Sequence, residues 1–269
     1  MKKHRAFLKW AGGKYGLIED INNLLPQGKR LVEPFVGAGS VFLNSDYEEY
    51  LLNDVNQDLI NLYQLVKLDV ATYIVAAKKL FTPEYNVEER YYQLRQQFNA
   101  SNDPFERSVL FLYLNRHGYN GLCRYNLKGG YNVPFGRYKK PYFPEVELLY
   151  FSEKSQRATF TCQCFRDTFS ETNVGDVIYC DPPYAPLSPT ASFTSYSGQG
   201  FKLIDQQELA QLAEISIEKN IPVLISNHDL PLTRELYHKA NLHIRSVKRT
   251  ISQKAGKRLK VDEVLAIYR

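Results

Sequence analysis

The chain of 269 residues lacks several features, and each absence narrows the kind of protein that it can be. Its four cysteines are Cys123, Cys162, Cys164 and Cys180; none pairs with a histidine at a zinc-ligand spacing, so we expect free thiols and no metal site. No apolar run approaches the ~20 residues needed to span a bilayer. No apolar signal core follows the basic start Met1–Arg5, so we expect a cytoplasmic protein without a membrane partner.

Acidic residues are missing from two stretches of a chain whose net charge is only +5. From Arg107 to Lys140 there are seven Lys or Arg residues and five tyrosines, but no Asp or Glu. Basic residues with interleaved aromatics suit a polyanion whose bases are also contacted. The stretch from Arg245 to Lys260 has seven basic residues and no acid. For this stretch a solvated basic loop is as good an interpretation as a surface that binds a polyanion.

The most informative residues that are present are Asp181-Pro182-Pro183-Tyr184, directly after the apolar run Val177–Cys180. The run predicts a buried strand, and two prolines without N–H groups end it. The chain then turns outward at the carboxyl end of a strand, where open α/β sheets bind their ligands. A carboxylate, backbone carbonyls and an aromatic ring suit a flat base held by its exocyclic amine. A capped strand end with a buried tyrosine is the simpler interpretation.

A second strand end carries glycines. Leu31-Val32 predicts a strand that stops at Glu33–Ser40, in which Phe35, Gly37 and Gly39 form a turn, and Val41–Leu43 fits the opening of a helix. The third glycine of a dinucleotide fingerprint and any phosphate-binding Walker loop are missing.

A turn that binds no phosphate suits a nucleoside cofactor, and S-adenosylmethionine has the required adenosine, ribose diol and amino-acid tail. Tyr50–Asp54 predicts a strand ending in an acid that accepts from ribose hydroxyls. Trp10 and Lys14 fit the methionine end, with Lys14 on its carboxylate; core packing is the alternative for Trp10.

Between the second strand and the later ones, the pattern predicts an inserted lobe. Residues 58–115 have helical periodicity, and the aromatic-rich runs on either side of Gly129-Gly130 predict a β-hairpin from Tyr119 to Tyr138. The core then resumes. Strands are predicted at 159–162, 177–180 and 221–227, a helix at 205–219, and a closing hairpin at 242–251 and 264–268. The fold class is therefore α/β.

Three blocks in this order, Phe7–Lys14, Glu33–Ser40 and Asp181–Tyr184, resemble those of the alpha-group DNA adenine-N6 methyltransferases. The likeness is close to the Dam family, which methylates adenine in GATC. It covers nearly the whole chain, including Arg116–Asn126 and Asn132–Tyr138.

The resemblance implies a Rossmann-like S-adenosylmethionine-dependent methyltransferase sheet, with an inserted DNA-recognition lobe of helices and a β-hairpin. The expected catalytic domain comprises residues 1–56 and 145–269, and the expected target-recognition domain residues 57–144. The implied partner is double-stranded DNA, and no obligate protein partner is expected.

The resemblance also assigns roles to residues. Those implied as catalytic are Asp181, Pro182 and Tyr184. Those implied to line the cofactor are Trp10, Lys14, Phe35, Gly37, Gly39, Asp54, Cys164, Phe165 and Asp181. Those implied to contact DNA are Lys9, Arg95, Arg116, Tyr119, Asn120, Leu122, Arg124, Asn126, Asn132, Pro134, Arg137, Tyr138 and Lys139.

Within the last set, Arg124 is expected to read a guanine through O6 and N7, and Leu122 and Pro134 to lie near a thymine methyl. A phosphate contact is the alternative for Arg124. The resemblance associates Lys9 with the outer guanine and Tyr119 with insertion beside the extruded adenine. Tyr184 would stack on that adenine, while Asp181 and the Pro182 carbonyl accept its two amine hydrogens.

Three other functions are compatible with parts of this pattern. A restriction-associated or RNA adenine-N6 methyltransferase with another target is the nearest. Glutamine methyltransferases carry Asn-Pro-Pro-Tyr, whereas this chain has Asp181 and a basic, tyrosine-rich segment. A non-catalytic DNA-binding regulator has no use for an intact Asp181 and Tyr184.

Overall fold

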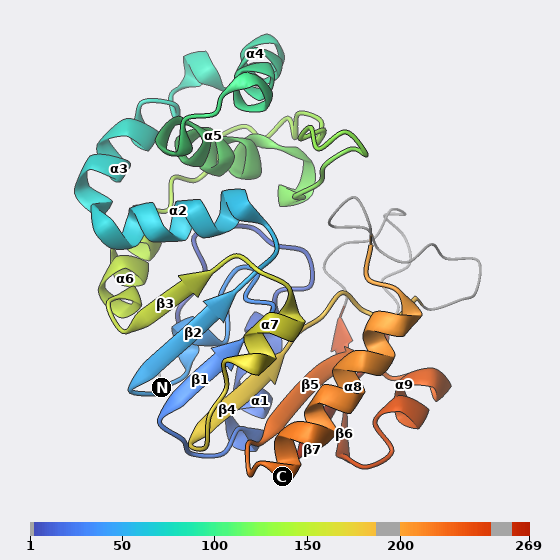
Figure 1. The fold of residues 1–269 in the computed structure, drawn as a ribbon. Helices are drawn as coiled ribbons and strands as arrows, with labels where there is room; N and C mark the ends of the chain where they lie inside the picture. The colour runs from blue at the N-terminus through green and yellow to red at the C-terminus, as the bar shows by residue number, and fades with distance from the viewer. Residues whose placement is uncertain (1–2, 187–199, 249–259) are drawn as a thin grey trace.

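A seven-stranded β-sheet organises the part of the chain that the computed structural model describes, residues 3–186, 200–248 and 260–269 (Figure 1). The strand order is β3-β2-β1-β4-β5-β7-β6. The strands are β1 Arg30–Glu33, β2 Glu49–Asn53, β3 Ala158–Thr161, β4 Asp176–Cys180, β5 Val223–His228, β6 Asn241–Lys248 and β7 Lys260–Tyr268. β1 to β5 are parallel, and β7 is antiparallel to both β5 and β6. The predicted α/β sheet with a final antiparallel hairpin is confirmed.

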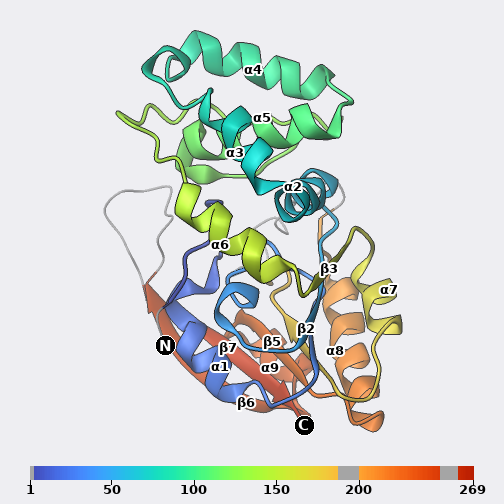
Figure 2. The same ribbon diagram turned by 90° about the vertical axis from the view of Figure 1, so that its left-hand side faces the viewer.

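Helices pack on the sheet and form a lobe above it. Those beside the sheet are α1 Ile18–Leu24, α2 Gln57–Leu68, α6 Glu145–Ser155, α7 Phe165–Ser170, α8 Leu203–Glu218 and α9 Pro231–Leu236. Those of the lobe are α3 Val70–Lys78, α4 Glu88–Ala100 and α5 Pro104–His117. Short 3₁₀ helices are η1 Lys14–Leu17, η2 Phe42–Asn44, η3 Pro83–Tyr85 and η4 Tyr119–Gly121. Figure 2 shows α3, α4 and α5 stacked above α2 and α6.

Both faces of the sheet are covered, which explains the short apolar runs of its strands. In β4, Val177 and Tyr179 point into a buried cluster that includes residues of α1 and α6. Ile178 and Cys180, which alternate with them, point into a second cluster with residues of α7, α8 and α9. Successive side chains of a strand face opposite ways, so a fully apolar strand belongs between two layers of helices.

The chain order creates a topological switch point between β1 and β4, and we call the region flanked by the turns after these two strands the crevice. β2 and β3 extend the sheet on one side of β1, whereas β4 and β5 extend it on the other. The loops that follow β1 and β4 therefore diverge at the carboxyl edge, where doubly wound sheets bind ligands. The Glu33–Ser40 turn and the Asp181–Tyr184 turn both lie at this point.

The lobe shares a core with the sheet. α5 begins where the Asp103 carboxylate accepts from Phe105 N at 2.8 Å and Glu106 N at 2.9 Å, with Pro104 in the first turn. From Val109 to Leu114 it is buried on all sides, as the central helix of the lobe. Residues of α2 and α5 belong to the same buried cluster as those of the sheet, so the boundary near residue 57 stays a prediction.

The β-hairpin predicted from Tyr119 to Tyr138 is present in an irregular form. The two limbs do run back on each other, but they form only isolated bridges, Gly118 with Phe135 and Tyr125 with Tyr131. These bridges are out of register, because seven steps separate Gly118 from Tyr125 and only four separate Tyr131 from Phe135. The surplus is taken up in η4, where Asn120 and Gly121 have φ of 53° and 61°. A local bulge of this size prevents a continuous ladder.

The helix predicted to open at Val41 is wrong, because only the three residues of η2 form there. The Asn44 side chain donates to the carbonyls of Ser40, at 2.8 Å, and His4, at 2.9 Å. Asparagine that binds nearby carbonyls competes with the helical pattern. Ser45 is then extended and leads into β2.

In the described residues no single helix is long and apolar enough to cross a membrane; α2 and α3 pass that test only as a pair, bent by 117°. Cys123 and Cys180 are buried, and Cys162 and Cys164 are partly buried; all four are free thiols. Most of the basic stretch from residue 245 to 260, and the end of the strand predicted at 242–251, lie outside the described residues.

Candidate active site

The turn after β4 is held by buried side chains of two neighbouring elements. Gln206 of α8 donates to the Pro183 carbonyl at 2.9 Å, and Asn227 of β5 accepts from Ala185 N at 3.0 Å. The two amides also bind each other, from Asn227 Nδ2 to Gln206 Oε1 at 3.0 Å. Both side chains are fully buried. A satisfied buried network of this kind gives the Asp181–Tyr184 turn one fixed shape.

Asp181 forms an ion pair at this turn. Its Oδ1 lies 2.9 Å from the Nζ of Lys14, which is buried and also donates to the Gly12 carbonyl at 2.5 Å. Burial raises the pKa of Asp181 to about 6; Lys14 opposes the rise, and Glu263 adds to it. A carboxyl group that changes charge near neutral pH in a crevice is typical of a functional site.

Tyr184 is fixed through both its hydroxyl and its ring. The hydroxyl donates to Glu263 Oε2 of β7 at 2.8 Å. The ring meets His228 edge-on, with centroids 4.8 Å apart, and the Lys14 ammonium lies 4.6 Å from the ring centroid. Burial raises the pKa of Tyr184 well above its usual range, so the hydroxyl remains a donor. The ring is therefore oriented before any ligand arrives.

The glycine turn after β1 carries Trp10 against its backbone. Gly37 and Gly39 have φ of 46° and 70°, a region that favours glycine. A Cβ added at Gly37 would approach Trp10 Nε1 to 2.9 Å, so any side chain there would displace the indole. Tyr63 of α2 donates to the Gly37 carbonyl at 2.5 Å and holds the turn from below.

Asp54 follows β2 and supports the same turn. Its Oδ2 accepts from Gly37 N at 3.1 Å and its Oδ1 from Asn56 N at 3.0 Å. Burial raises the pKa of Asp54 to about 6, and these backbone bonds oppose the rise. Each carboxylate oxygen keeps a second lone pair, so the group can accept further hydrogen bonds.

Three aromatic rings lie beside the turn. The centroids of Phe35 and Phe165 are 5.4 Å apart, and Phe201 lies 5.7 Å from Phe35 and 5.6 Å from Phe165. Cys164 precedes α7, and its Sγ accepts from Arg166 at 3.2 Å. Phe35, Cys164 and Phe165, which were predicted as one group, therefore lie close together.

Segment Phe7–Lys14 joins this crevice to residues 118–139, which we call the tyrosine-rich loop (the green segment beside α5 in Figure 1). Lys9 N donates to Asn115 Oδ1 at 2.9 Å, and Asn115 Nδ2 donates back to the Lys9 carbonyl at 2.7 Å. The Lys9 ammonium lies 3.9 Å from the centroid of Tyr138. Lys9 therefore lies against the tyrosine-rich loop, whereas Lys14 lies at the crevice.

Arg124 lies exposed on the tyrosine-rich loop and is oriented by Asn132. Its Nε donates to Asn132 Oδ1 at 2.7 Å, and its Nη2 donates to the Asn132 carbonyl at 3.1 Å. These bonds use one edge of the guanidinium. Nη1 and the second hydrogen of Nη2 form the other edge, which is the edge that a bidentate contact needs.

The remaining residues that were predicted to contact DNA differ in exposure. Those that are exposed are Tyr119, Asn120, Asn126, Pro134, Arg137 and Lys139. Those that are partly buried are Lys9, Arg95, Leu122, Asn132 and Tyr138. Arg116 is only 8% exposed, packs over the ring of Tyr142 and leaves its Nε without a partner among the described residues. The structure does not bring the Arg116 side chain to the exposed surface of the loop.

Sequence reasoning missed the side chains that support the turn after β4, namely Gln206, Asn227, His228 and Glu263. A signal was present for two of them, since Asn227-His228 ends a predicted strand at the same carboxyl edge. It also missed Glu33 at the end of β1. Glu33 is 2% exposed with its Oε1 unpaired among the described residues, and burial raises its pKa well above the usual range.

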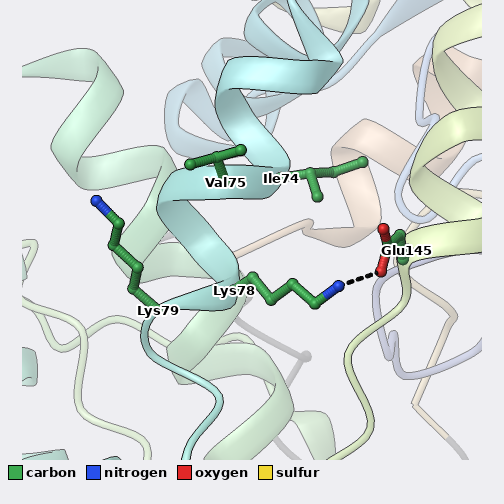
Figure 3. Close-up of a pocket in the computed structure, with 5 residues that line it drawn as sticks. All are labelled: Ile74, Val75, Lys78, Lys79 and Glu145. Carbon is green, nitrogen blue, oxygen red and sulfur yellow. Dashed lines mark hydrogen bonds and ion pairs between the residues drawn. The ribbon is translucent and has the colours of Figure 1, made fainter.

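A separate cavity lies away from this crevice, on α3 and the start of α6 (Figure 3). It is lined by Ile74, Val75, Lys78, Lys79 and Glu145, and Lys78 forms an ion pair with Glu145 at 2.7 Å. None of the predicted site residues lines it. In the described part of the chain no group of three or more His, Cys, Asp or Glu side chains could hold a metal ion.

Comparison with known proteins agrees with this geometry. Residues 10–251 match the family model described as D12 class N6 adenine-specific DNA methyltransferase. The chain is 61% identical over 269 residues to the DNA adenine methylase of Escherichia coli (strain K12), covering 100% of this chain and 97% of the relative. It is 58% identical to that of Serratia marcescens, with 100% of both chains covered. A relative from Vibrio cholerae serotype O1 is 60% identical, with 100% and 97% covered.

Among solved structures, a conserved hypothetical protein of Streptococcus pyogenes matches with a TM-score of 0.38 and 11% identity. It covers 94% of this chain and 92% of that chain, and a likeness this distant supports no argument about function.

Proposed function

Because the chain belongs to the D12 class of N6 adenine-specific DNA methyltransferases, we propose that it methylates adenine N6 in double-stranded GATC, with S-adenosylmethionine as donor. Membership of the family makes the chain a DNA adenine methyltransferase, which requires a methyl donor and a DNA substrate. The identity of the donor, the duplex target, its sequence and the extrusion of the adenine are the proposed parts.

One observation carries the proposal: segment Phe7–Lys14 reaches from the reactive turn to the tyrosine-rich loop. Lys14 pairs with Asp181, and Lys9 lies on Tyr138 of the loop. A turn suited to an exocyclic amine and a basic loop suited to duplex DNA are thus linked by one short segment of the chain. Such a connection is what a sequence-specific base-modifying enzyme needs.

The residues at the crevice fit S-adenosylmethionine. Trp10 and the glycine turn form a close wall, and Asp54 keeps lone pairs for the ribose hydroxyls. Phe35 and Phe165 offer rings to a flat adenine. The Lys14 ammonium suits the carboxylate of the methionine end. When bound, S-adenosylmethionine supplies a methyl group on a positively charged sulfur.

The protein's own residues act on the target amine. An adenine amine cannot reach a pocket from inside a duplex, so the base is extruded. Tyr184 stacks on it in an orientation fixed by Glu263. The Asp181 carboxylate and the Pro182 carbonyl accept the two amine hydrogens and direct the nitrogen lone pair at the methyl carbon. Asp181, with its pKa of about 6, is suited to take the proton that the nitrogen loses.

Residues of the tyrosine-rich loop supply the sequence reading. Arg124 reads a guanine with its outer edge, and Leu122 and Pro134 contact a thymine methyl. Lys9 faces the outer guanine, and exposed Tyr119 inserts beside the extruded adenine. In this proposal residues 57–144 form the target-recognition part, and residues 1–56 and 145–269 the catalytic part.

The proposal is tested by transfer of a labelled methyl group from S-adenosylmethionine to a GATC duplex. Duplexes with each base pair replaced in turn, and an RNA of matching sequence, serve as comparisons. We expect labelled N6-methyladenine in the GATC duplex and a large loss for each replacement. Equal transfer to a different site, or faster transfer to RNA, would contradict the proposal.

Arg124→Ala should relax discrimination at one guanine by about 1–3 kcal/mol, because a bidentate contact is lost there. The measurement is kcat/KM on GATC and on duplexes changed at single base pairs. Arg90→Ala is the control, because Arg90 is an exposed arginine of α4 outside the set expected to contact DNA, and it forms an ion pair with Glu84 at 3.9 Å. A uniform loss across all duplexes in Arg124→Ala would make Arg124 a phosphate contact instead.

A further inference from the structure

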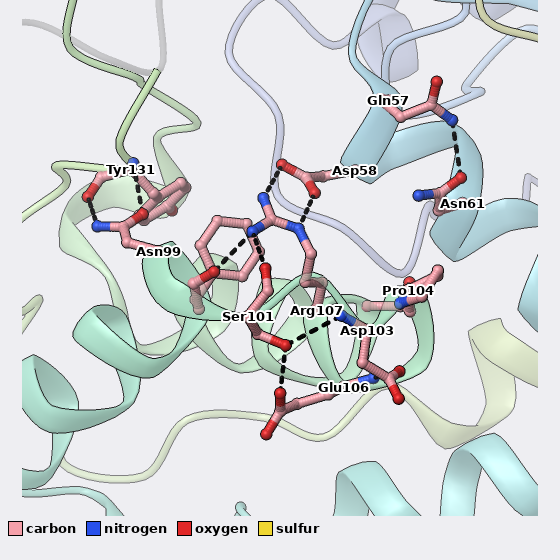
Figure 4. A network of polar contacts seen from close by, with 12 residues as sticks. Gln57, Asp58, Asn61, Asn99, Ser101, Asp103, Pro104, Glu106, Arg107 and Tyr131 are labelled. Carbon is pink, nitrogen blue, oxygen red and sulfur yellow. Dashed lines mark hydrogen bonds and ion pairs between the residues drawn. The ribbon is translucent and has the colours of Figure 1, made fainter. Parts of the chain in front are cut away.

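Asn99 of α4 pairs with the backbone of Tyr131 in the tyrosine-rich loop (Figure 4). Asn99 Nδ2 donates to the Tyr131 carbonyl at 3.1 Å, and Tyr131 N donates to Asn99 Oδ1 at 2.8 Å. One side-chain amide thus satisfies both backbone groups of one residue. A neighbouring β-strand would do the same, but on the side of this limb that faces α4 no strand is present in the described residues.

Two further residues of α4 hold the same limb. Tyr91 Oη donates to the Val133 carbonyl at 2.9 Å, and Arg95 Nη1 donates to it at 3.0 Å. Tyr91, Arg95 and Asn99 are spaced by four residues, so they lie on one face of the helix. This face fixes the backbone on both sides of Asn132.

Asn132 in turn orients Arg124, because its side chain and its carbonyl both accept from the guanidinium. Asn132 N also donates to the Arg124 carbonyl at 3.1 Å. The position of the guanidinium therefore depends on the backbone at residue 132. That backbone is set on one side by Asn99 and on the other by Tyr91 and Arg95.

We propose that Asn99 is a positioning residue for sequence discrimination, which acts through Tyr131 and Asn132 on the guanidinium of Arg124. The inference rests on the proposed function of Arg124 as the reader of a guanine. Among the described residues Asn99 contacts no part of the reactive crevice, so its loss changes which sequences are methylated more than how fast the best one is.

A variant of Asn99 should still fold. The residue is exposed, so water can reach the Tyr131 backbone groups after substitution. The Tyr131 side chain is buried, and its hydroxyl donates to the Leu122 carbonyl at 2.9 Å. The other limb is anchored separately, where Tyr125 donates to Asp58 at 2.7 Å; Figure 4 shows Asp58 paired with Arg107.

The experiment compares the full-length wild type with Asn99→Ala, Arg124→Ala and the double variant. Each is assayed by kcat/KM on GATC and on four duplexes with single base pairs replaced. Gln97→Ala is the matched control, because Gln97 lies on the same helix but donates to Glu106 at 2.6 Å rather than to the loop. Thermal unfolding of every variant reports whether the fold has changed.

We expect Asn99→Ala to reduce discrimination about tenfold at the same base pair as Arg124→Ala and at none of the other three. In the Arg124→Ala background the Asn99 substitution should add nothing, since its route is already broken. Gln97→Ala should discriminate as the wild type does.

Equal loss at all four base pairs, unchanged discrimination, or a full effect in the Arg124→Ala background would each overturn the role of Asn99. Different outcomes contradict the role of Arg124 and the role of Asn99. If Arg124→Ala itself changes no single base pair, the proposed role of Arg124 fails and takes the route from Asn99 with it. If Arg124→Ala relaxes one base pair and Asn99→Ala does not, only the Asn99 inference fails.

Discussion

Asp181→Asn should change the way in which the stability of the protein depends on pH. Burial raises the pKa of Asp181 from 3.8 to about 6, with Lys14 acting in the opposite direction. The folded protein therefore holds the Asp181 proton more tightly than the unfolded chain does. The stability that this group contributes is fully present below pH 3.8 and is lost as the pH rises through about 6.

The magnitude follows from the two pKa values. The full difference corresponds to about 3 kcal/mol, and the part lost between pH 5 and pH 7.5 to about 1.4 kcal/mol. These are upper values, because 23% of the Asp181 side chain is exposed and water screens part of the cost. Asparagine does not titrate, so the variant should lack this component. Loss of the ion pair with Lys14 displaces the whole curve without producing the same slope.

The assay is urea unfolding of both proteins at half-unit steps from pH 5 to pH 7.5, without added cofactor. Only the difference between the two curves is used. Asp54, with its pKa raised to about 6, contributes in the same direction as Asp181. His117, whose pKa burial lowers to about 4, contributes in the opposite direction. Both are present in the two proteins and cancel.

We expect the stability of the wild type, relative to that of the variant, to decrease by about 1.4 kcal/mol across this range. Methyl transfer by the variant should be lost, because an asparagine amide cannot take the proton of the target amine. Parallel stability curves would refute a raised pKa at Asp181. Substantial turnover by the variant would refute its role as the acceptor.

Two further substitutions test the supports of the site and of the loop. Gln206→Leu should lower kcat at least tenfold and reduce the free energy of unfolding by about 1–3 kcal/mol for each polar group left unpaired, at Pro183 and Asn227. Single-turnover methyl transfer and urea unfolding measure these two effects. An unchanged kcat would show that the turn keeps its shape without Gln206. Gly121→Ala should weaken methylation of GATC and destabilise the protein by about 1–3 kcal/mol, because φ is +61° and the added Cβ overlaps the Lys9 side chain. Gly129→Ala is its control, with φ of +79° and open space for the Cβ, and equal effects in the two variants would remove Lys9 from the explanation.

The elements that could be predicted from the sequence have local causes. Val177–Cys180 is apolar at every position and is followed by two prolines, so a buried strand and its end are both visible in a few residues. The glycines of the turn after β1 were recognisable in the same way, and both have positive φ in the structure. Local chemistry was sufficient in these cases because the neighbours in sequence decide the backbone conformation.

The irregular form of the hairpin and the absence of the helix predicted at Val41 depend on contacts that are distant in sequence. The tyrosine-rich loop alternates like a hairpin, but its surplus residues are held in η4, where Asn120 N donates to the Tyr138 hydroxyl at 3.0 Å and Gly121 lies against Lys9. Val41–Leu43 suits a helix, but Asn44 binds His4, which is 40 residues away. Arg116, which the basic composition of its stretch had placed on a DNA-facing surface, is buried because it packs over the ring of Tyr142.

The sequence by itself determined which chemical groups stand at the ends of which strands: Asp181 and Tyr184 after one, the glycine turn after another and Asp54 after a third. Parallel strands bring such ends to one edge, so their meeting was predictable. Only the tertiary structure decided how each group is supported. Gln206, Asn227 and Glu263 hold the reactive turn, and Phe7–Lys14 links it to the tyrosine-rich loop, because hydrogen bonds and ion pairs between remote residues depend on distances that no local pattern specifies.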